Sequence, residues 1–176
     1  MSAPSLGAGS PASGDKGASS ILFKHGHLPM GCDIHYVIER KLEDGVWLGV
    51  VSTDYSLQFP EAARRNYEFF AALAGVRGSG PEPLGFPEDC SNLTQHCIEC
   101  WDSDGHSHSF LPLEEFYNRF VRTYEEHYNT LVRLKLTDCK SYESWQYNVV
   151  RQMTCGACDT FSDSMSDFRV VFWFDN

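Results

Sequence analysis

Residues 168–174, Phe168-Arg-Val-Val-Phe-Trp-Phe174, form a continuous run of β-branched and aromatic side chains that decides the fold. A strand with one solvent-facing side alternates apolar and polar residues, whereas a strand covered on both faces is apolar almost throughout. The run therefore predicts a central strand, and the rest of the chain has to supply its neighbours.

Three other segments are candidate neighbours. In residues 32–40 apolar side chains alternate with polar ones, which is the period of a half-buried strand. The turn sequence Glu43-Asp44-Gly45 separates this segment from a β-rich run at 46–52, so the two are predicted to form an antiparallel hairpin. Residues 106–111 are also predicted to be extended.

Helical patterns fill the intervals between these strands. Capping residues, helix formers and aromatic side chains at four-residue spacing predict helices over 62–75, 91–101, 112–136 and 142–153. The predicted fold class is α+β, a small and mainly antiparallel sheet packed against helices that cover it on one side.

The length of 176 residues predicts one domain with a tail. The first residues are rich in Ser, Ala, Gly and Pro and have no apolar period, so residues 1–29 are predicted to be a disordered N-terminal extension. Residues 30–176 are predicted to form a single α+β domain.

The composition disfavours several classes of protein. Fourteen Lys+Arg against 24 Asp+Glu give a formal net charge of -10, which repels a phosphate backbone and argues against nucleic-acid binding. The apolar run at 169–174 is far shorter than the ~20 residues that cross a bilayer, so no membrane span is predicted. Seven cysteines, an odd number, and the lack of a secretory-signal pattern predict a cytoplasmic protein.

Two short segments carry polar side chains in a pattern suited to metal binding. Asp33 and His35 lie at i and i+2 of the first strand, so both leave the same face of the sheet. His106 and His108 have the same spacing and are expected to align in the same way. Imidazoles and a carboxylate can hold a divalent metal such as zinc or manganese, which activates a bound water for hydrolysis. These four residues are the predicted metal ligands.

Other side chains complete this hypothesis. Asp89 is the predicted catalytic base, and Arg65 is predicted to neutralise an anionic substrate. Asp175 is a further candidate ligand or base. A structural interpretation stands beside the functional one: the two histidines face solvent, and Asp33 pairs with an arginine.

Cysteine spacing gives a separate signal. Cys97-Ile-Glu-Cys100 and Cys155-Gly-Ala-Cys158 are pairs with two intervening residues, the spacing used by structural zinc sites. The gap between the pairs is much longer than in compact zinc ribbons. A structural four-cysteine zinc site, a redox-active pair and buried idle thiols are the three alternatives.

Several short motifs are spread along the chain. They are Met30-Gly-Cys-Asp-Ile-His35, Arg65-Asn-Tyr67, Leu73-Ala-Gly-Val-Arg-Gly78, Gly85-Phe-Pro-Glu-Asp89 with Ser91, Asp104-Gly-His-Ser-His-Ser109 and Phe172-Trp-Phe-Asp-Asn176. Together they resemble a family of small uncharacterised proteins found in bacteria and their phages, and the likeness covers residues 30–176. The resemblance implies no mechanism, and neither cysteine pair belongs to the family pattern. It singles out the charged and polar residues of the motif blocks, among them Asn66, Asp104 and Asp175 besides the predicted site residues.

Two functions follow as hypotheses. The first is a metal-dependent hydrolase acting on a small polar or phosphorylated substrate, with the ligands, base and arginine named above. The second is a non-catalytic, phage-type binding or inhibitor module whose acidic surface engages a basic protein partner, with or without the four-cysteine zinc site.

Overall fold

A computed structural model describes residues 31–57, 60–136, 141–157 and 165–176. Contacts within the chain set residues 31–176 apart as one unit, and the description concerns this unit alone. The predicted disordered extension at residues 1–29 lies outside the described residues.

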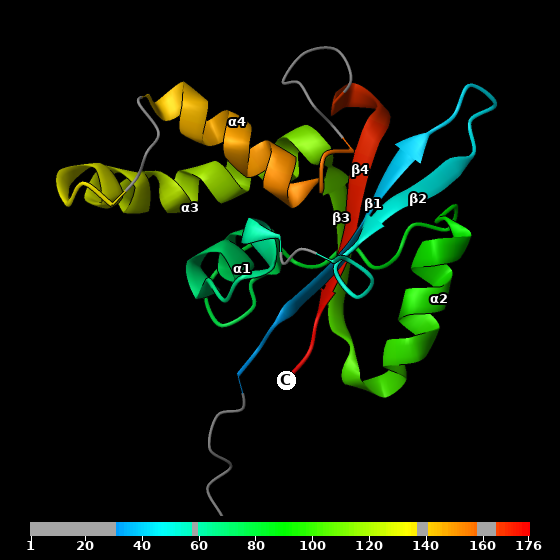
Figure 1. The fold of residues 1–176 in the computed structure, drawn as a ribbon. Coiled ribbons are helices and arrows are strands. Elements are labelled where there is room, and N and C mark those ends of the chain that lie inside the picture. The colour runs from blue at the N-terminus through cyan, green and yellow to red at the C-terminus, as the bar shows by residue number, and fades with distance from the viewer. Residues whose placement is uncertain (1–30, 58–59, 137–140, 158–164) are drawn as a thin grey trace, which may run out of the picture. The chain divides into compact units, whose positions relative to one another are not determined.

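A four-stranded antiparallel sheet forms the centre of this unit (Figure 1). The strands are β1 (Ile34–Lys41), β2 (Trp47–Ser52), β3 (His106–Pro112) and β4 (Phe168–Phe174), in the order β2-β1-β4-β3. All four predicted strands are therefore present. The apolar run at 168–174 is buried over its whole length between two neighbours, as a central strand requires.

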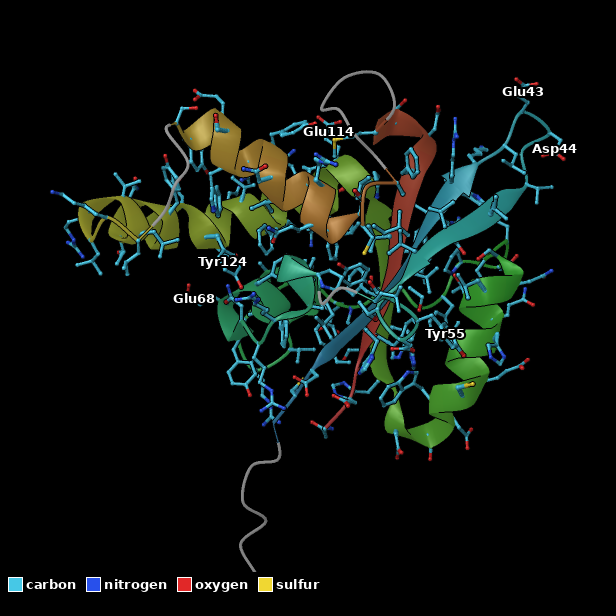
Figure 2. All side chains as sticks on the ribbon, in the orientation of Figure 1. Glu43, Asp44, Tyr55, Glu68, Glu114 and Tyr124 are labelled. Atoms are coloured by element: carbon cyan, nitrogen blue, oxygen red, sulfur yellow. The ribbon has the colours of Figure 1, made fainter. Side chains whose placement is uncertain are left out.

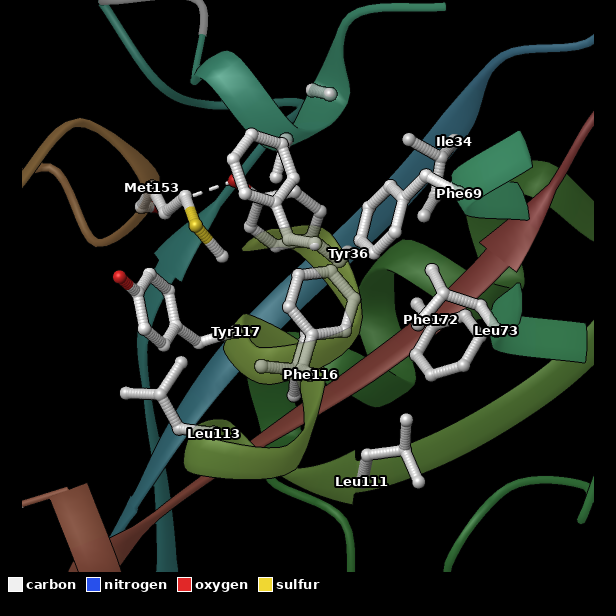
Figure 3. Close-up of a cluster of buried hydrophobic side chains, with 14 of the residues drawn as sticks. Ile34, Tyr36, Phe69, Leu73, Leu111, Leu113, Phe116, Tyr117, Met153 and Phe172 are labelled. Atoms are coloured by element: carbon white, nitrogen blue, oxygen red, sulfur yellow. Dashed lines mark hydrogen bonds between the residues drawn. The ribbon is translucent and has the colours of Figure 1, made fainter. Parts of the chain in front are cut away.

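Three helices pack on one face of the sheet: α1 (Tyr67–Ala74), α3 (Leu113–Arg133) and α4 (Tyr142–Met153). Figure 3 shows the aromatic side chains of this face, where Tyr36 donates a hydrogen bond to the carbonyl of Met153 at 3.1 Å. The aromatic stripe of α3 lies in this core. Its members are Phe116, Phe120, Tyr124 and Tyr128. The antiparallel sheet with helices packed against it confirms the predicted α+β fold class.

The fourth helix, α2 (Asn92–Trp101), covers the opposite face (Figure 1). Its Cys97 is buried against Val37 of β1 and Trp173 of β4. The prediction that helices cover the sheet on one side is therefore wrong. The error arises because α2 buries few residues, too few to indicate in the sequence that a helix covers the second face.

Local sequence explains where the helices begin and end. Asn66 caps α1 by accepting a hydrogen bond from the Phe69 amide, and Gly75 ends the helix with a φ of 67°. The predicted helix over 62–75 is consequently shorter, because a 3-10 turn, η1 (Glu61–Ala63), precedes the cap. Two further 3-10 turns are η2 (Asp102–Asp104) and η3 (Met165–Asp167).

Candidate functional site

Polar side chains gather at the end of the sheet where β1 and β3 begin and β4 finishes. Because β4 runs antiparallel to both neighbours, its last residues lie beside the first residues of β1 and β3. His35 pairs with Trp173, and His106 pairs with Phe174. The Asp175 amide continues the pairing by donating to the Asp33 carbonyl at 3.2 Å. Most of the predicted site residues are therefore at one end of the molecule's sheet.

His35 lies between two carboxylates. Its Nδ1 is 2.8 Å from Asp54 Oδ1, and its Nε2 is 3.5 Å from Asp175 Oδ2. The Asp54 carboxylate is an acceptor, so Nδ1 carries the proton and donates it. Nε2 is screened from solvent and has no hydrogen-bond partner among the described residues. The imidazole is thus held in one tautomer, with its second nitrogen directed at Asp175.

Two tryptophans complete the surroundings of His35. The Trp101 ring lies 3.9 Å from the His35 ring, and the Trp173 ring lies 6.0 Å away and nearly parallel. Trp101 Nε1 also donates to Asp54 Oδ2 at 2.8 Å. Burial acts to raise the pKa of Asp54, but the hydrogen bonds from His35 and Trp101 outweigh it and lower this pKa below its ordinary value. Asp54 is therefore an ionised partner that orients the imidazole.

Asp33 and Arg65 form a bidentate ion pair beside this histidine. Arg65 Nε donates to Asp33 Oδ1 at 2.7 Å, and Nη2 donates to Oδ2 at 2.6 Å. The hydrogen bond from Arg65 lowers the pKa of Asp33 and raises that of the guanidinium. The Asp33 amide donates to Asp175 Oδ1 at 2.9 Å, which fixes the Asp175 carboxylate. Asp33, His35 and Arg65 are thus brought together, with Asp175 as the common neighbour.

His106 lies on the opposite face of the sheet, where its ring stacks 6.2 Å from that of Phe174. Its Nδ1 is 3.0 Å from the Ser107 hydroxyl, and its Nε2 is buried with no hydrogen-bond partner among the described residues. Both residues line an open depression of about 710 Å³, together with Arg77 and Asn176. This depression adjoins the end of β4 but is separated from His35 by the sheet.

His108 lies on the same face as His35, but Trp173 stands between them. The His108 ring packs 4.1 Å from Phe86, and both His108 Nε2 and Trp173 Cδ1 border Gly105. Burial lowers the pKa of His108. The expectation that His106 and His108 align on one face is wrong, because a β-bulge between His106 and Ser109 reverses the alternation.

Asp89 lies in the turn before α2, near the opposite end of the sheet, where β4 begins. Arg169 Nη1 donates to Asp89 Oδ1 at 2.7 Å, Trp47 Nε1 donates to Oδ2 at 3.1 Å, and the bond from Arg169 lowers the pKa of Asp89. Arg169 is four residues from Trp173 along β4, or about 13 Å at ~3.3 Å per residue. The predicted base is therefore fully paired and distant from His35.

Among the residues that the structure describes, no three His, Cys, Asp or Glu side chains converge as a metal-ligand group. The predicted ligands Asp33 and His35 lie together, whereas His106 and His108 lie on opposite faces. Metal binding by these four residues stays a prediction. Asp54 was missed because a carboxylate directly after a strand resembles ordinary turn chemistry.

The cysteines of the two predicted Cys-x-x-Cys pairs lie in different surroundings. Cys97 is buried with its sulfur 3.5 Å from the Ser52 hydroxyl, whereas Cys100 is exposed. Cys155 is also exposed and lies 3.0 Å from the Ser56 hydroxyl. Cys158 lies outside the described residues, so the four-cysteine hypothesis is not tested.

The fold and this site define an α+β domain with a histidine–carboxylate cluster at one end of its sheet. No family model, curated protein or solved structure matches the chain. The function is therefore argued from the side chains alone.

Proposed function

We propose that this protein is a hydrolase acting on a small polar, anionic substrate, such as a phosphate ester, at the end of the sheet where β4 finishes. The observation that carries the proposal is the row Asp54–His35–Asp175, in which an imidazole has a carboxylate at each ring nitrogen. Neighbouring titratable groups held close together in fixed positions are characteristic of acid–base centres.

Asp175 is the member of the row that faces a substrate. His35 Nε2 is screened from solvent, whereas the Asp175 side chain is about one-fifth exposed. Asp175 takes a proton from the attacking water, and the adjacent imidazole of His35 stabilises or accepts that proton. The water oxygen bonds to the phosphorus or carbonyl carbon, and the departing oxygen or nitrogen receives the proton as its bond breaks. Asp54 stabilises the imidazolium formed in between.

Arg65 supplies positive charge for an anionic substrate at this end of the sheet. Arg65 is about half exposed while paired with Asp33, so its guanidinium presents unused donors to solvent. A phosphate oxygen is a good partner for such a group. Arg65 therefore keeps the role of an anion clamp, and Asp33 holds it in place.

A divalent metal, zinc or manganese, is a separate part of the proposal. Of the predicted ligands Asp33, His35, His106 and His108, a single ion is proposed on Asp33 and His35, because the sheet separates them from His106, and Trp173 separates His35 from His108. Elemental analysis of the purified protein tests it, with about one equivalent expected if the ion belongs to the fold. Loss of this ion in a His35→Gln variant, together with its retention in a His106→Ala, His108→Ala double variant, is the result that supports this pair. The acid–base row above requires no such ion.

Hydrolysis of a panel of phosphoesters and amides, with and without added Zn²⁺ or Mn²⁺, tests the activity. Asp175→Asn and His35→Gln are each expected to lower kcat/KM by roughly 100-fold or more. Arg65→Lys is expected to raise KM for anionic substrates. Glu99→Gln, an exposed carboxylate on α2, is the control and leaves the rate unchanged. A wild-type protein that hydrolyses nothing in the panel refutes the proposal.

A second candidate is the binding module, which one observation favours. The edge strand β2 leaves Leu48 and Val50 exposed, and an edge strand can accept a strand from a partner. The net charge of -10 favours a basic partner. Val50→Lys is expected to abolish such pairing without affecting hydrolysis, which separates the two candidates.

One further proposal concerns the localisation of the protein. No helix in the described part of the chain is both long and apolar enough to cross a membrane. Cytoplasmic localisation is supported by the odd cysteine count and is tested by fractionating cells that make the protein.

A further inference from the structure

The outer face of α2 carries an imidazole and a thiol one helical turn apart. His96 and Cys100 are at i and i+4, positions that lie on the same side of a helix. The His96 Nε2 is 3.8 Å from the Cys100 sulfur. Tyr55, which Figure 2 shows beside α2, places its hydroxyl 2.9 Å from the same nitrogen. Three donor atoms of different chemistry therefore meet at one point.

Packing of the helix against the sheet holds these donors in position. Cys97 points inward and is almost completely buried, so His96 and Cys100 are turned outward. The bond from Trp101 to Asp54 ties the segment after β2 to the end of α2. Tyr55 follows Asp54 directly, and its ring lies nearly parallel to that of His96. The arrangement is thus built from two elements of the fold.

We propose that His96, Cys100 and Tyr55 form a binding site for a thiophilic divalent cation of the zinc class. In tetrahedral coordination, with about 2.3 Å to sulfur and about 2.0–2.1 Å to nitrogen, these two ligand atoms lie about 3.6 Å apart. The sulfur–nitrogen distance in the structure is 3.8 Å. The corresponding edge between nitrogen and oxygen is about 3.3 Å, and the structure has 2.9 Å. These two edges therefore differ from the tetrahedral values by about 0.2 Å and about 0.4 Å, and a water fills the fourth position.

The chemistry of the donors selects the ion. A thiolate and an imidazole bind zinc, cobalt and copper in preference to magnesium or calcium, which take oxygen ligands. On binding, the Cys100 thiol loses its proton to solvent and a metal–sulfur bond forms. Tyr55 keeps its proton and coordinates through a lone pair of the neutral hydroxyl oxygen, since desolvation by its surroundings raises the pKa of the phenol. No change of oxidation state is involved.

The site differs from the four-cysteine zinc site that is one of the alternatives from the sequence. In that site Cys97 and Cys100 bind the same ion, but in the structure Cys97 faces the sheet and contacts Ser52. His96, four positions before Cys100, lies on the same exposed face of α2, whereas Cys97, three positions before it, does not. A pattern of cysteines alone therefore misses His96.

Titration of the full-length, reduced protein with Co²⁺, followed by competition with Zn²⁺, tests the site. One equivalent of cobalt is expected to produce a thiolate-to-metal charge-transfer band that zinc removes. Cys100→Ser is expected to abolish the band, and His96→Gln to weaken binding at least about tenfold. Tyr55→Phe, which removes the weakest of the three donors, is expected to weaken binding up to about tenfold.

Cys155→Ser is the matched control, because Cys155 is an exposed thiol bonded to a hydroxyl and not to an imidazole. It is expected to bind cobalt as the wild type does. The proposal is overturned if no charge-transfer band forms, if the band survives Cys100→Ser, or if Cys155→Ser removes it equally. Unchanged circular dichroism of each variant shows that loss of binding is not loss of fold.

Discussion

The buried carboxylate of Glu39 offers a sharp test of what stabilises the sheet. Glu39 is fully buried and accepts hydrogen bonds from the Ser91 amide at 2.6 Å and from the Thr94 hydroxyl at 2.5 Å. Its other oxygen accepts a bond from Arg169 Nε at 2.6 Å. Arg169 is itself only 7% exposed, so the charge of each depends on the other.

Glu39→Gln keeps the shape of the side chain but removes its charge. The amide oxygen still accepts from the Ser91 amide, whereas the amide nitrogen now faces the Arg169 guanidinium, donor against donor. Removing one partner of a buried pair costs about 3–5 kcal/mol, because the Arg169 charge then keeps only the exposed carboxylate of Asp89 as its partner. At about 2–4 °C per kcal/mol for a domain of this size, the melting temperature is expected to fall by roughly 6–20 °C.

Asp89→Asn is the matched control, since it removes a carboxylate from the same guanidinium. The Asp89 side chain is 68% exposed, so solvent screens its interaction with Arg169 and the expected loss is below about 1 kcal/mol. Urea unfolding followed by circular dichroism measures both free energies. If Glu39→Gln costs no more than Asp89→Asn, the buried pair does not stabilise the fold in the way described.

Three other substitutions test separate parts of the structure. Tyr36→Phe removes the buried hydrogen bond to the Met153 carbonyl and is expected to lower the free energy of unfolding by about 1–2 kcal/mol in urea titrations. Burial lowers the pKa of His108 below its ordinary value of 6.5, so the unfolded chain binds more protons than the folded one and the free energy of unfolding falls as the pH drops below about 6.5. His108→Gln is expected to make this fall less steep. An unchanged pH profile of the variant contradicts the prediction. Gly80→Ala places a Cβ on the Ala71 carbonyl oxygen of α1, so it is expected to lower the melting temperature, whereas an unchanged value shows that Gly80 does not pack closely against α1.

Much of the fold was predictable because periodicity reports burial directly. The continuous apolar run of β4 indicates a strand that is covered on both faces. The alternation in β1 predicted a half-buried strand, and this was wrong, because α2 covers the second face and Val37 and Glu39 are buried as well. The position of α2 was not predictable in this way. Its contact with the sheet rests on Cys97 and a few partly buried neighbours, too small a set to give a distinct apolar stripe.

The charged residues were harder to assign, because sequence spacing does not reveal pairing between distant segments. Arg169 stands within the apolar run of β4, and Glu39 is 130 positions earlier, yet the strand register places them opposite each other. Asp89 joins them because the cap of α2 begins two residues later. A carboxylate that resembled a free base in the sequence is thus part of an ion-pair network.

The histidine pair shows how one extra residue redirects a functional hypothesis. His106 pairs with Phe174 and Ser109 with Phe172, so three steps along β3 match two along β4. Ser107 absorbs the difference with a φ of 53°, a conformation that non-glycine residues rarely adopt. His106 therefore shares the face of Phe174, whereas His108 shares that of Trp173. Because serine carries no signal for this backbone conformation, regular alternation was the natural expectation. With the pair divided by the sheet, the acid–base chemistry proposed for this protein rests on Asp175 and His35, whose contact depends on the regular pairing of β1 with β4 and on the hydrogen bond from the Asp33 amide to Asp175.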